Sequence, residues 1–225
     1  MARVTKLSDI KISDIKFSAV VPNKKGGKAI YLNDANGGKL TIRLPPMKAI
    51  VGVSPYYNDK SDKKSVQNYK MPLAVSDPKV VDFLKALDKA VLDHIKTHES
   101  QFFNKKTLKD MMVNYKPFLQ EPEPGKGYAP LLKTNIIWTK ETDTFGTDFY
   151  DEKGTDINPV DLIGKNGREV TALVQLSSIY NTPAGFGLSI RLVQAKVASV
   201  VEMPKRALVD DPVEEEEEYE EEDEE

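Results

Sequence analysis

The sequence predicts a mainly β protein in which long, bent strands close into a small barrel around one prominent α-helix. Only residues 78–97 carry an extended helical pattern, whereas strand-like sequence fills 131–139, 168–176 and 187–203. The chain also contains 14 Pro and 13 Gly, which favours a fold with many turns. We therefore expect strands and turns to dominate and a single long helix to pack on them.

The first strands are expected as a hairpin with residues 28–32 and 39–44 as its arms. Asn36-Gly37 is the residue pair that a tight hairpin turn favours. Apolar and polar residues alternate in the second arm, which indicates one buried and one exposed face. The two prolines at 45–46 are expected to end the hairpin, and residues 54–70 to form a long surface loop.

The long helix is expected from Pro78 to Thr97. Asp77 can cap it and Pro78 suits its first turn. Its apolar positions follow at spacings of four, three, four and four: Val80, Leu84, Leu87, Val91 and Ile95. A shorter helix is predicted over residues 105–115.

The remaining strands are expected after a break at residues 121–125. They cover 131–139, 168–176 and 187–203, and a loop rich in Asp, Thr and Gly fills 140–156. The last strand alternates and then shifts phase, as a bulged or strongly bent strand does.

The charges are separated along the chain. Residues 210–225 contain 13 Asp or Glu and no Lys or Arg. Of the 35 acidic residues this leaves 22 in residues 1–209, which hold all 32 basic residues, so that part carries about +10 and the tail −13. The net charge of −3 describes neither part.

Several classes of chemistry are excluded or disfavoured by the residue types. There is no Cys, which excludes disulfides, thiolate metal sites and a Cys nucleophile. His94 and His98 share a helix face, but exposed histidines near a helix end explain them better than a metal site. Gly125-Lys-Gly127 and Gly164-Lys-Asn-Gly167 lack the pattern of a phosphate-binding loop and are read as turns. We expect no enzyme activity, cofactor or metal.

No apolar run is long enough to cross a membrane, and the first 16 residues lack a signal-peptide core. We therefore expect an intracellular protein without membrane association.

Basic and aromatic residues interleave on the expected strands. Unpaired bases stack on aromatic rings while Lys and Arg contact phosphates, so this pattern indicates a site for single-stranded nucleic acid. Trp138 and Phe186 could equally be core residues, whereas Tyr180 precedes a turn and is expected to be exposed. The candidate binding residues are Tyr31, Arg43, Lys133, Trp138, Arg168, Tyr180, Phe186 and Arg191.

The acidic tail can act on the basic body. Its sixteen residues extend to about 50 Å, comparable with a domain of this size. A polyanion of this length imitates nucleic acid, so the tail is expected to weaken nucleic-acid binding.

Two stretches resemble a known family. Residues 158–201, with Asn158-Pro-Val-Asp-Leu-Ile-Gly164, Arg168, Tyr180-Asn-Thr182 and the strand after Gly185, resemble the single-stranded DNA-binding proteins of T-odd bacteriophages and of large eukaryotic DNA viruses. The segment Ala29-Ile-Tyr-Leu-Asn33 through Met47 resembles the algal-virus members in particular.

The resemblance implies an oligonucleotide/oligosaccharide-binding (OB) barrel over residues 1–205 and a disordered acidic tail over 206–225. It implies that Tyr180 stacks on bases and that Arg168 is a basic position entering the same strand. Ser178 replaces a second aromatic residue of the phage proteins, and Glu224-Glu225 stands where they end in an aromatic. The tail would contact replicative DNA polymerase and helicase/primase through Glu214, Glu218, Tyr219, Glu222 and Asp223.

The function expected is sequence-independent binding of single-stranded DNA in viral replication, recombination and repair, at viral replication sites in the host cell. Whether the protein forms a homodimer stays open. Two alternatives also stay open: an acidic-tailed chaperone or adaptor for basic proteins, and an RNA-binding barrel.

Overall fold

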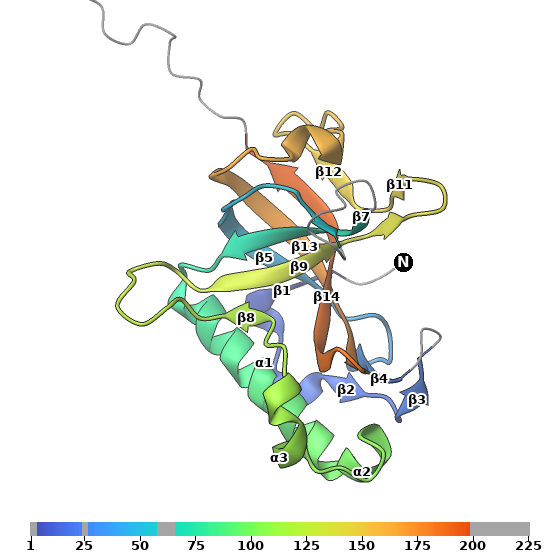
Figure 1. Ribbon diagram of the computed structural model, residues 1–225. Helices are drawn as coiled ribbons and strands as arrows, with labels where there is room; N and C mark the ends of the chain where they lie inside the picture. The colour runs from blue at the N-terminus through green and yellow to red at the C-terminus, as the bar shows by residue number, and fades with distance from the viewer. Residues whose placement is uncertain (1–3, 24–26, 58–65, 199–225) are drawn as a thin grey trace, which may run out of the picture.

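Two long antiparallel strands, β13 (Arg168–Thr182) and β14 (Gly185–Val197), form the centre of the computed structural model (Figure 1). The structure describes residues 4–23, 27–57 and 66–198. The register of the two strands shifts twice, between Leu173 and Val174 and between Leu176 and Ser178. These bulges bend the strands, as the phase shift in the sequence predicted.

Three further strands close a barrel with this pair: β5 (Thr41–Ala49), β7 (Val66–Ala74) and β9 (Leu131–Ile136). The ring runs β5–β7–β9–β14–β13 and returns to β5. Within this ring of five strands, only the β9–β14 pairing is parallel. In chain order the ring reads 1-2-3-5-4, which is the strand order of the OB barrel. The prediction of a mainly β, OB-type fold is confirmed.

The predicted hairpin of residues 28–32 and 39–44 is wrong. Strand β4 (Lys28–Asn33) and β5 both pair with β13, where β4 covers residues 178–181 and β5 covers 168–175. They form one long strand interrupted by residues 34–40, and one isolated bridge, Asn33 to Lys39, joins their ends. The turn at Asn36-Gly37 does form, with Gly37 at φ 82°. The residues of the turn therefore predict the turn correctly. The pairing of β4 and β5 with the distant strand β13 decides the topology instead.

Two further predictions before the long helix are corrected. The prolines at 45 and 46 do not end a strand, because β5 continues through them. The described part of the predicted loop 54–70 is the antiparallel pair β6 (Ser54–Tyr57) and β7. Pro55 lies within β6 and Pro72 within β7. Because proline normally marks a strand end, the sequence did not indicate these strands.

Short strands extend the sheet around the barrel. Strand β1 runs parallel to β5, and β12 runs parallel to β14. The short strands are β1 (Val4–Lys6), β2 (Lys16–Phe17), β3 (Val21–Pro22), β8 (Leu119–Gln120), β10 (Trp138–Thr139), β11 (Thr144–Phe145) and β12 (Asp148–Tyr150).

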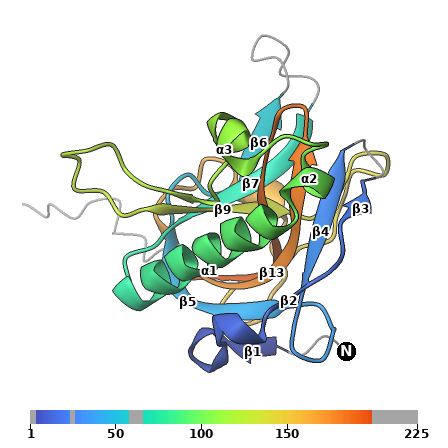
Figure 2. The ribbon, with the colours of Figure 1, turned by 90° about the horizontal axis from the view of Figure 1, so that it is seen from below.

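The predicted long helix is confirmed as α1 (Pro78–Thr97), which lies across one end of the barrel (Figure 2). The Asp77 carboxylate accepts a hydrogen bond from the Lys79 backbone N at 2.9 Å. The five apolar positions of the sequence pattern are all buried. Each such side chain contributes about 1.5–3 kcal/mol on burial, so packing on the barrel stabilises the helix more than its cap does.

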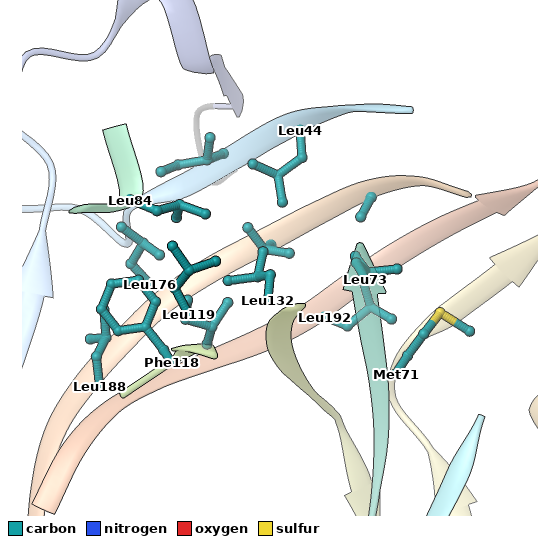
Figure 3. Packing of buried hydrophobic residues seen from close by; sticks show 14 of the residues in the cluster. Leu44, Met71, Leu73, Leu84, Phe118, Leu119, Leu132, Leu176, Leu188 and Leu192 are labelled. Atoms are coloured by element: carbon teal, nitrogen blue, oxygen red, sulfur yellow. The ribbon is translucent and has the colours of Figure 1, made fainter. Parts of the chain in front are cut away.

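The core fills the barrel and continues to the helix. Figure 3 shows Leu84 of α1 close to Leu176 of β13, with Leu132 and Leu192 further along the same cluster. All four side chains are at most 2% exposed. The barrel and α1 therefore share one hydrophobic core.

A helical segment follows α1 and returns the chain to the sheet. The predicted helix over 105–115 is confirmed only in part, as one α-turn and one 3-10 turn. Lys116 N then donates to the Phe186 carbonyl of β14 at 2.8 Å. The short helices are α2 (Glu99–Phe102), α3 (Leu108–Met111), η1 (Leu7–Asp9), η2 (Ile12–Asp14), η3 (Met112–Asn114) and η4 (Pro159–Leu162).

Candidate nucleic-acid interface

A row of polar side chains crosses the outer surface of three neighbouring barrel strands. Lys70 of β7 lies opposite Asn135 of β9, which lies opposite Arg191 of β14. Residues in register on paired strands point to the same side of a sheet, so these three side chains form one row. Lys133 lies on the same side of β9 one outward position earlier, opposite Pro72.

The three strands of this surface carry positively charged residues and no acidic residue. Strands β7, β9 and β14 contain Lys70, Lys133, Arg191 and Lys196 and no Asp or Glu. Burial and the neighbouring ammonium groups of Lys70 and Lys116 lower the pKa of Lys133 below its ordinary value. Burial makes the larger contribution to this shift, and the two neighbouring lysine charges add a repulsion that a bound anion would relieve.

Two exposed tyrosines stand at the edges of the cationic row. The Tyr56 ring is 49% exposed, and Lys70 Nζ lies 4.7 Å from its centroid. At the other edge Tyr31 of β4 is 47% exposed and lies opposite Ser178, which in turn lies opposite Ser189 of β14. We call this surface the β7–β9–β14 face; it comprises Tyr31, Tyr56, Lys70, Lys116, Lys133, Asn135 and Arg191.

The spacing of the face suits an extended strand. From the strand of Tyr56 to the strand of Tyr31 there are five steps between neighbouring strands, β6–β7–β9–β14–β13–β4. At about 4.8 Å per step this corresponds to roughly 24 Å around the surface. A single strand of nucleic acid crossing it can therefore meet an aromatic ring at each edge and cations between them.

The predicted residues Tyr31, Lys133 and Arg191 come together on this face, whereas Arg43 does not. Arg43 lies opposite Leu173 of β13 and next to Lys6 of β1, where it lines a separate groove. The sequence does not distinguish Arg43 from the residues of the face, because it predicts for Arg43 a hairpin that does not form.

Phe186 is corrected from a binding residue to a core residue. It is fully buried, with its ring centroid 5.0 Å from Phe103 and 5.1 Å from Tyr115. A ring with no exposed surface offers no platform for a base.

Trp138 is half-buried beside the face. Its ring meets Tyr69 edge-on with centroids 5.1 Å apart, and Nε1 donates to Asp143 Oδ1 at 2.9 Å. The nearby Asp143 carboxylate makes this end less attractive to phosphate than the centre of the face.

Tyr180 is half-buried, which differs from the exposed position expected. It lies opposite Gly187, and a Cβ placed on Gly187 would lie 3.4 Å from the Tyr180 hydroxyl, in ordinary van der Waals contact. Burial raises the Tyr180 pKa. The same Cβ would lie 2.4 Å from the Lys116 carbonyl oxygen, so the segment after η3 requires glycine at this position.

Arg168 begins β13, whereas Tyr180 stands near its end. Twelve residues separate them, about 40 Å along an extended strand. The two residues that the resemblance relates therefore lie near opposite ends of the same strand. Arg168 lies opposite Ala49, and its Nε is buried without a hydrogen-bond partner among the described residues.

Lys70, Tyr56, Lys116 and Asn135 also lie on the face, although the sequence does not single them out as candidate binding residues. Lys70 and Tyr56 stand among the lysines and tyrosines of residues 54–70, a stretch that the sequence predicts as a loop and that instead contributes to strands β6 and β7. Lys116 comes to the face through its backbone contact with β14, which has no signal in the local sequence.

Other site types find no support in the described part of the chain. No group of three or more His, Cys, Asp or Glu there is placed to hold a metal ion. His94 stacks on Phe17 with centroids 4.2 Å apart. No helix in this part is both long and apolar enough to span a membrane. The predicted tail residues Glu214, Glu218, Tyr219, Glu222 and Asp223 lie outside the described residues.

Comparison with solved structures finds bacteriophage proteins. The single-stranded DNA-binding protein from bacteriophage Enc34 in complex with ssDNA has a TM-score of 0.45 and 13% identity, covering 80% of this chain and 94% of that chain. Gp2.5, a single-stranded DNA binding protein encoded by bacteriophage T7, has a TM-score of 0.41 and 14% identity, covering 74% of this chain and 90% of that chain.

A search of the curated proteins gives no match. The family described as "Protein of unknown function (DUF2738)" matches residues 57–225, which include β7, β9, β13 and β14. Since this match extends over more than half of the chain, the protein belongs to the DUF2738 family.

Proposed function

We propose that this protein binds single-stranded DNA, without sequence preference, across the β7–β9–β14 face. The observation that carries the proposal is the row of Lys70, Asn135 and Arg191, in which two cations flank a neutral amide on strands without acidic residues. Such a row contacts phosphates whatever the base sequence is.

The tyrosines favour a single strand over a duplex. Only unpaired bases offer their flat faces for stacking, at about 1–3 kcal/mol per base. Tyr31 and Tyr56 are each about half exposed at the edges of the row and can receive a base without a change in the core. An OB barrel binding in this way occupies about 4–16 nucleotides.

The acidic residues 210–225 would lower the affinity, because 13 carboxylates attached to a cationic body compete with phosphates. A long strand offers many phosphates at once and overcomes this competition. A protein of this kind covers strands exposed during viral replication, recombination and repair, and its acidic residues offer a contact for replication proteins. These roles come from the resemblance described above.

The proposal is tested by fluorescence anisotropy of a labelled thymidine oligonucleotide with the full chain over a salt series. We expect the triple variant K70A/K133A/R191A to bind roughly 1,000-fold more weakly or worse, because charge-assisted contacts contribute about 1.5–3 kcal/mol each. The slope of log affinity against log salt should fall by about 2, at 0.7 per lost phosphate contact.

The control is K89A/K96A/K165A, which removes the same charge from exposed lysines elsewhere. If both triple variants weaken binding equally, net charge and not the face is responsible. If the unmodified protein does not bind at low salt, the proposal fails and a chaperone or adaptor for basic proteins becomes the function to pursue. Competition with an RNA oligonucleotide of the same length decides between DNA and RNA.

A further inference from the structure

A second cationic surface lies over β5 and β13, next to the start of α1. Two adjoining pockets of ≈ 530 Å³ and ≈ 250 Å³ share Arg43, Thr171 and Lys196 as lining residues. We call them together the β5–β13 groove. Its cations are Lys6, Arg43, Lys79 and Lys196.

The cations of the groove come from four separate elements. The chain places Lys6 of β1 beside Arg43 of β5 through a parallel pairing. Lys196 of β14 lies opposite Thr171 of β13, and Lys79 stands in the first turn of α1. None of the four forms an ion pair with a described residue, whereas Lys85 and Lys126 elsewhere do.

Among the residues that the structure describes, one acidic side chain lines the groove, and it already has a structural role. Asp77 caps α1, and its carboxylate accepts from the Lys79 backbone N. Four cations around a concave surface repel one another, so their arrangement favours an anionic occupant. The positive end of α1, whose first turn lines the groove, adds to this preference.

The walls of the groove differ from those of the β7–β9–β14 face. They include apolar side chains such as Leu7, Pro45 and Phe83. Tyr31 and Tyr56, the exposed rings of the face, do not line the groove, whose own aromatic lining residues Phe83 and Tyr150 are both half-buried. An acidic peptide with scattered apolar side chains suits such walls better than a run of stacked bases.

The chain itself carries an acidic segment of this chemistry, which follows β14 after a short connection. Lys196 lines both pockets and stands one residue before the end of β14. Residues 210–225 hold 13 acids together with Pro212, Val213 and Tyr219. From the end of the described chain, the intervening residues 199–209 can span up to about 36–40 Å. The acidic residues can therefore reach every part of the groove.

We propose that the β5–β13 groove is the docking site of residues 210–225 of the same chain. Attachment through a short connection gives an effective concentration in the millimolar range, so even a weak site is occupied. The groove adjoins the β7–β9–β14 face along β14, where Arg191 belongs to the face and Lys196 to the groove. The docked acidic residues lower the positive potential over the face and leave Tyr31 and Tyr56 uncovered.

The proposal is tested on the full chain by carbodiimide coupling, which joins a Lys amine to a carboxylate as an amide with loss of water, followed by peptide mapping of the monomer. We expect residues 210–225 to be joined mainly to Lys6, Lys79 and Lys196, and much less to the exposed Lys89 and Lys96. About 1 M salt should abolish these products, because the Debye length falls to about 3 Å.

The matched variant is Arg43→Gln, which removes one cation of the groove and keeps its three lysines as reporters. It should reduce the yield of groove products several-fold and leave other products unchanged. Products with Lys70, Lys116 and Lys133 instead would place the acidic residues on the face and overturn the proposal. An even distribution over exposed lysines would do the same.

Nucleic acid is the other candidate occupant, and the same lysines report on it. If Lys6, Lys79 and Lys196 are protected from acetylation only after an oligonucleotide is added, the groove is part of the nucleic-acid path and the proposal fails. The coupling experiment needs no DNA, so its result is independent of whether the β7–β9–β14 face binds DNA.

Discussion

The β7–β9–β14 face and the β5–β13 groove have the same sign of charge but different surroundings. On the face, Lys70, Lys133 and Arg191 lie between two exposed tyrosine rings. In the groove, cations from four elements surround apolar side chains beside the start of α1. Charge alone therefore does not identify a ligand; the neighbouring side chains decide whether stacked bases or an acidic peptide fits.

The two surfaces also depend on the barrel in different ways. The face lies on three strands whose pairing forms the barrel wall. The groove requires β1 and the start of α1, which are brought to β5 and β13 from outside the five-stranded ring. Changes in the shared core should affect stability, and changes on each surface should affect only its own ligand.

The largest effect is expected from Leu87→Ala in α1. Leu87 is fully buried at the end of the barrel, and its truncation should lower the free energy of unfolding by about 2–5 kcal/mol. Urea unfolding measures this change, with Lys89→Ala on the exposed side of α1 as the control. Oligonucleotide affinity below the unfolding transition should be unchanged. A loss of affinity in the folded variant would show that α1 shapes the face directly.

The next effect is expected from the tyrosines. Tyr31→Ala and Tyr56→Ala should each weaken binding of a thymidine oligonucleotide by about 1–3 kcal/mol, the value of one stacked base. Tyr128→Ala is the control, because Tyr128 is 74% exposed but lies outside both surfaces. Coupling of the acidic residues to the groove should not change in any of these variants. If all three variants bind the oligonucleotide with the same affinity, Tyr31 and Tyr56 do not stack on bases. The exposed rings would then not distinguish the ligand of the face from that of the groove.

The smallest effect is expected from the protonation of Lys133. Burial and the charges of Lys70 and Lys116 lower its pKa from 10.5, so it loses its charge at a lower pH than an ordinary lysine does. Phosphate binds the charged form, and affinity should therefore begin to fall below pH 10.5, by less than about tenfold.

Lys133→Arg tests this assignment, because arginine stays protonated throughout that range. The variant should bind with an affinity that changes less with pH. Anisotropy titrations of both proteins between neutral and alkaline pH provide the comparison. Parallel pH profiles would mean that Lys133 does not contact phosphate.

Local sequence determined α1 and the separation of charge. The spacing of Val80, Leu84, Leu87, Val91 and Ile95 fixes one apolar stripe, and Asp77-Pro78 fixes its start, since both depend on neighbours within a few residues. The phase shift in residues 187–203 likewise indicated the bulge in β14. The tail charge follows from composition alone.

The tertiary structure decided which strands pair and hence where the candidate site lies. Tyr31 and Arg43 were expected together, but β4 and β5 run along different parts of β13, so one reaches the face and the other the groove. Phe186 became a core residue because the segment around Tyr115 packs over it. Backbone pairing between distant strands has no short-range sequence period, and for this reason the sequence predicted the barrel but not the composition of its two cationic surfaces.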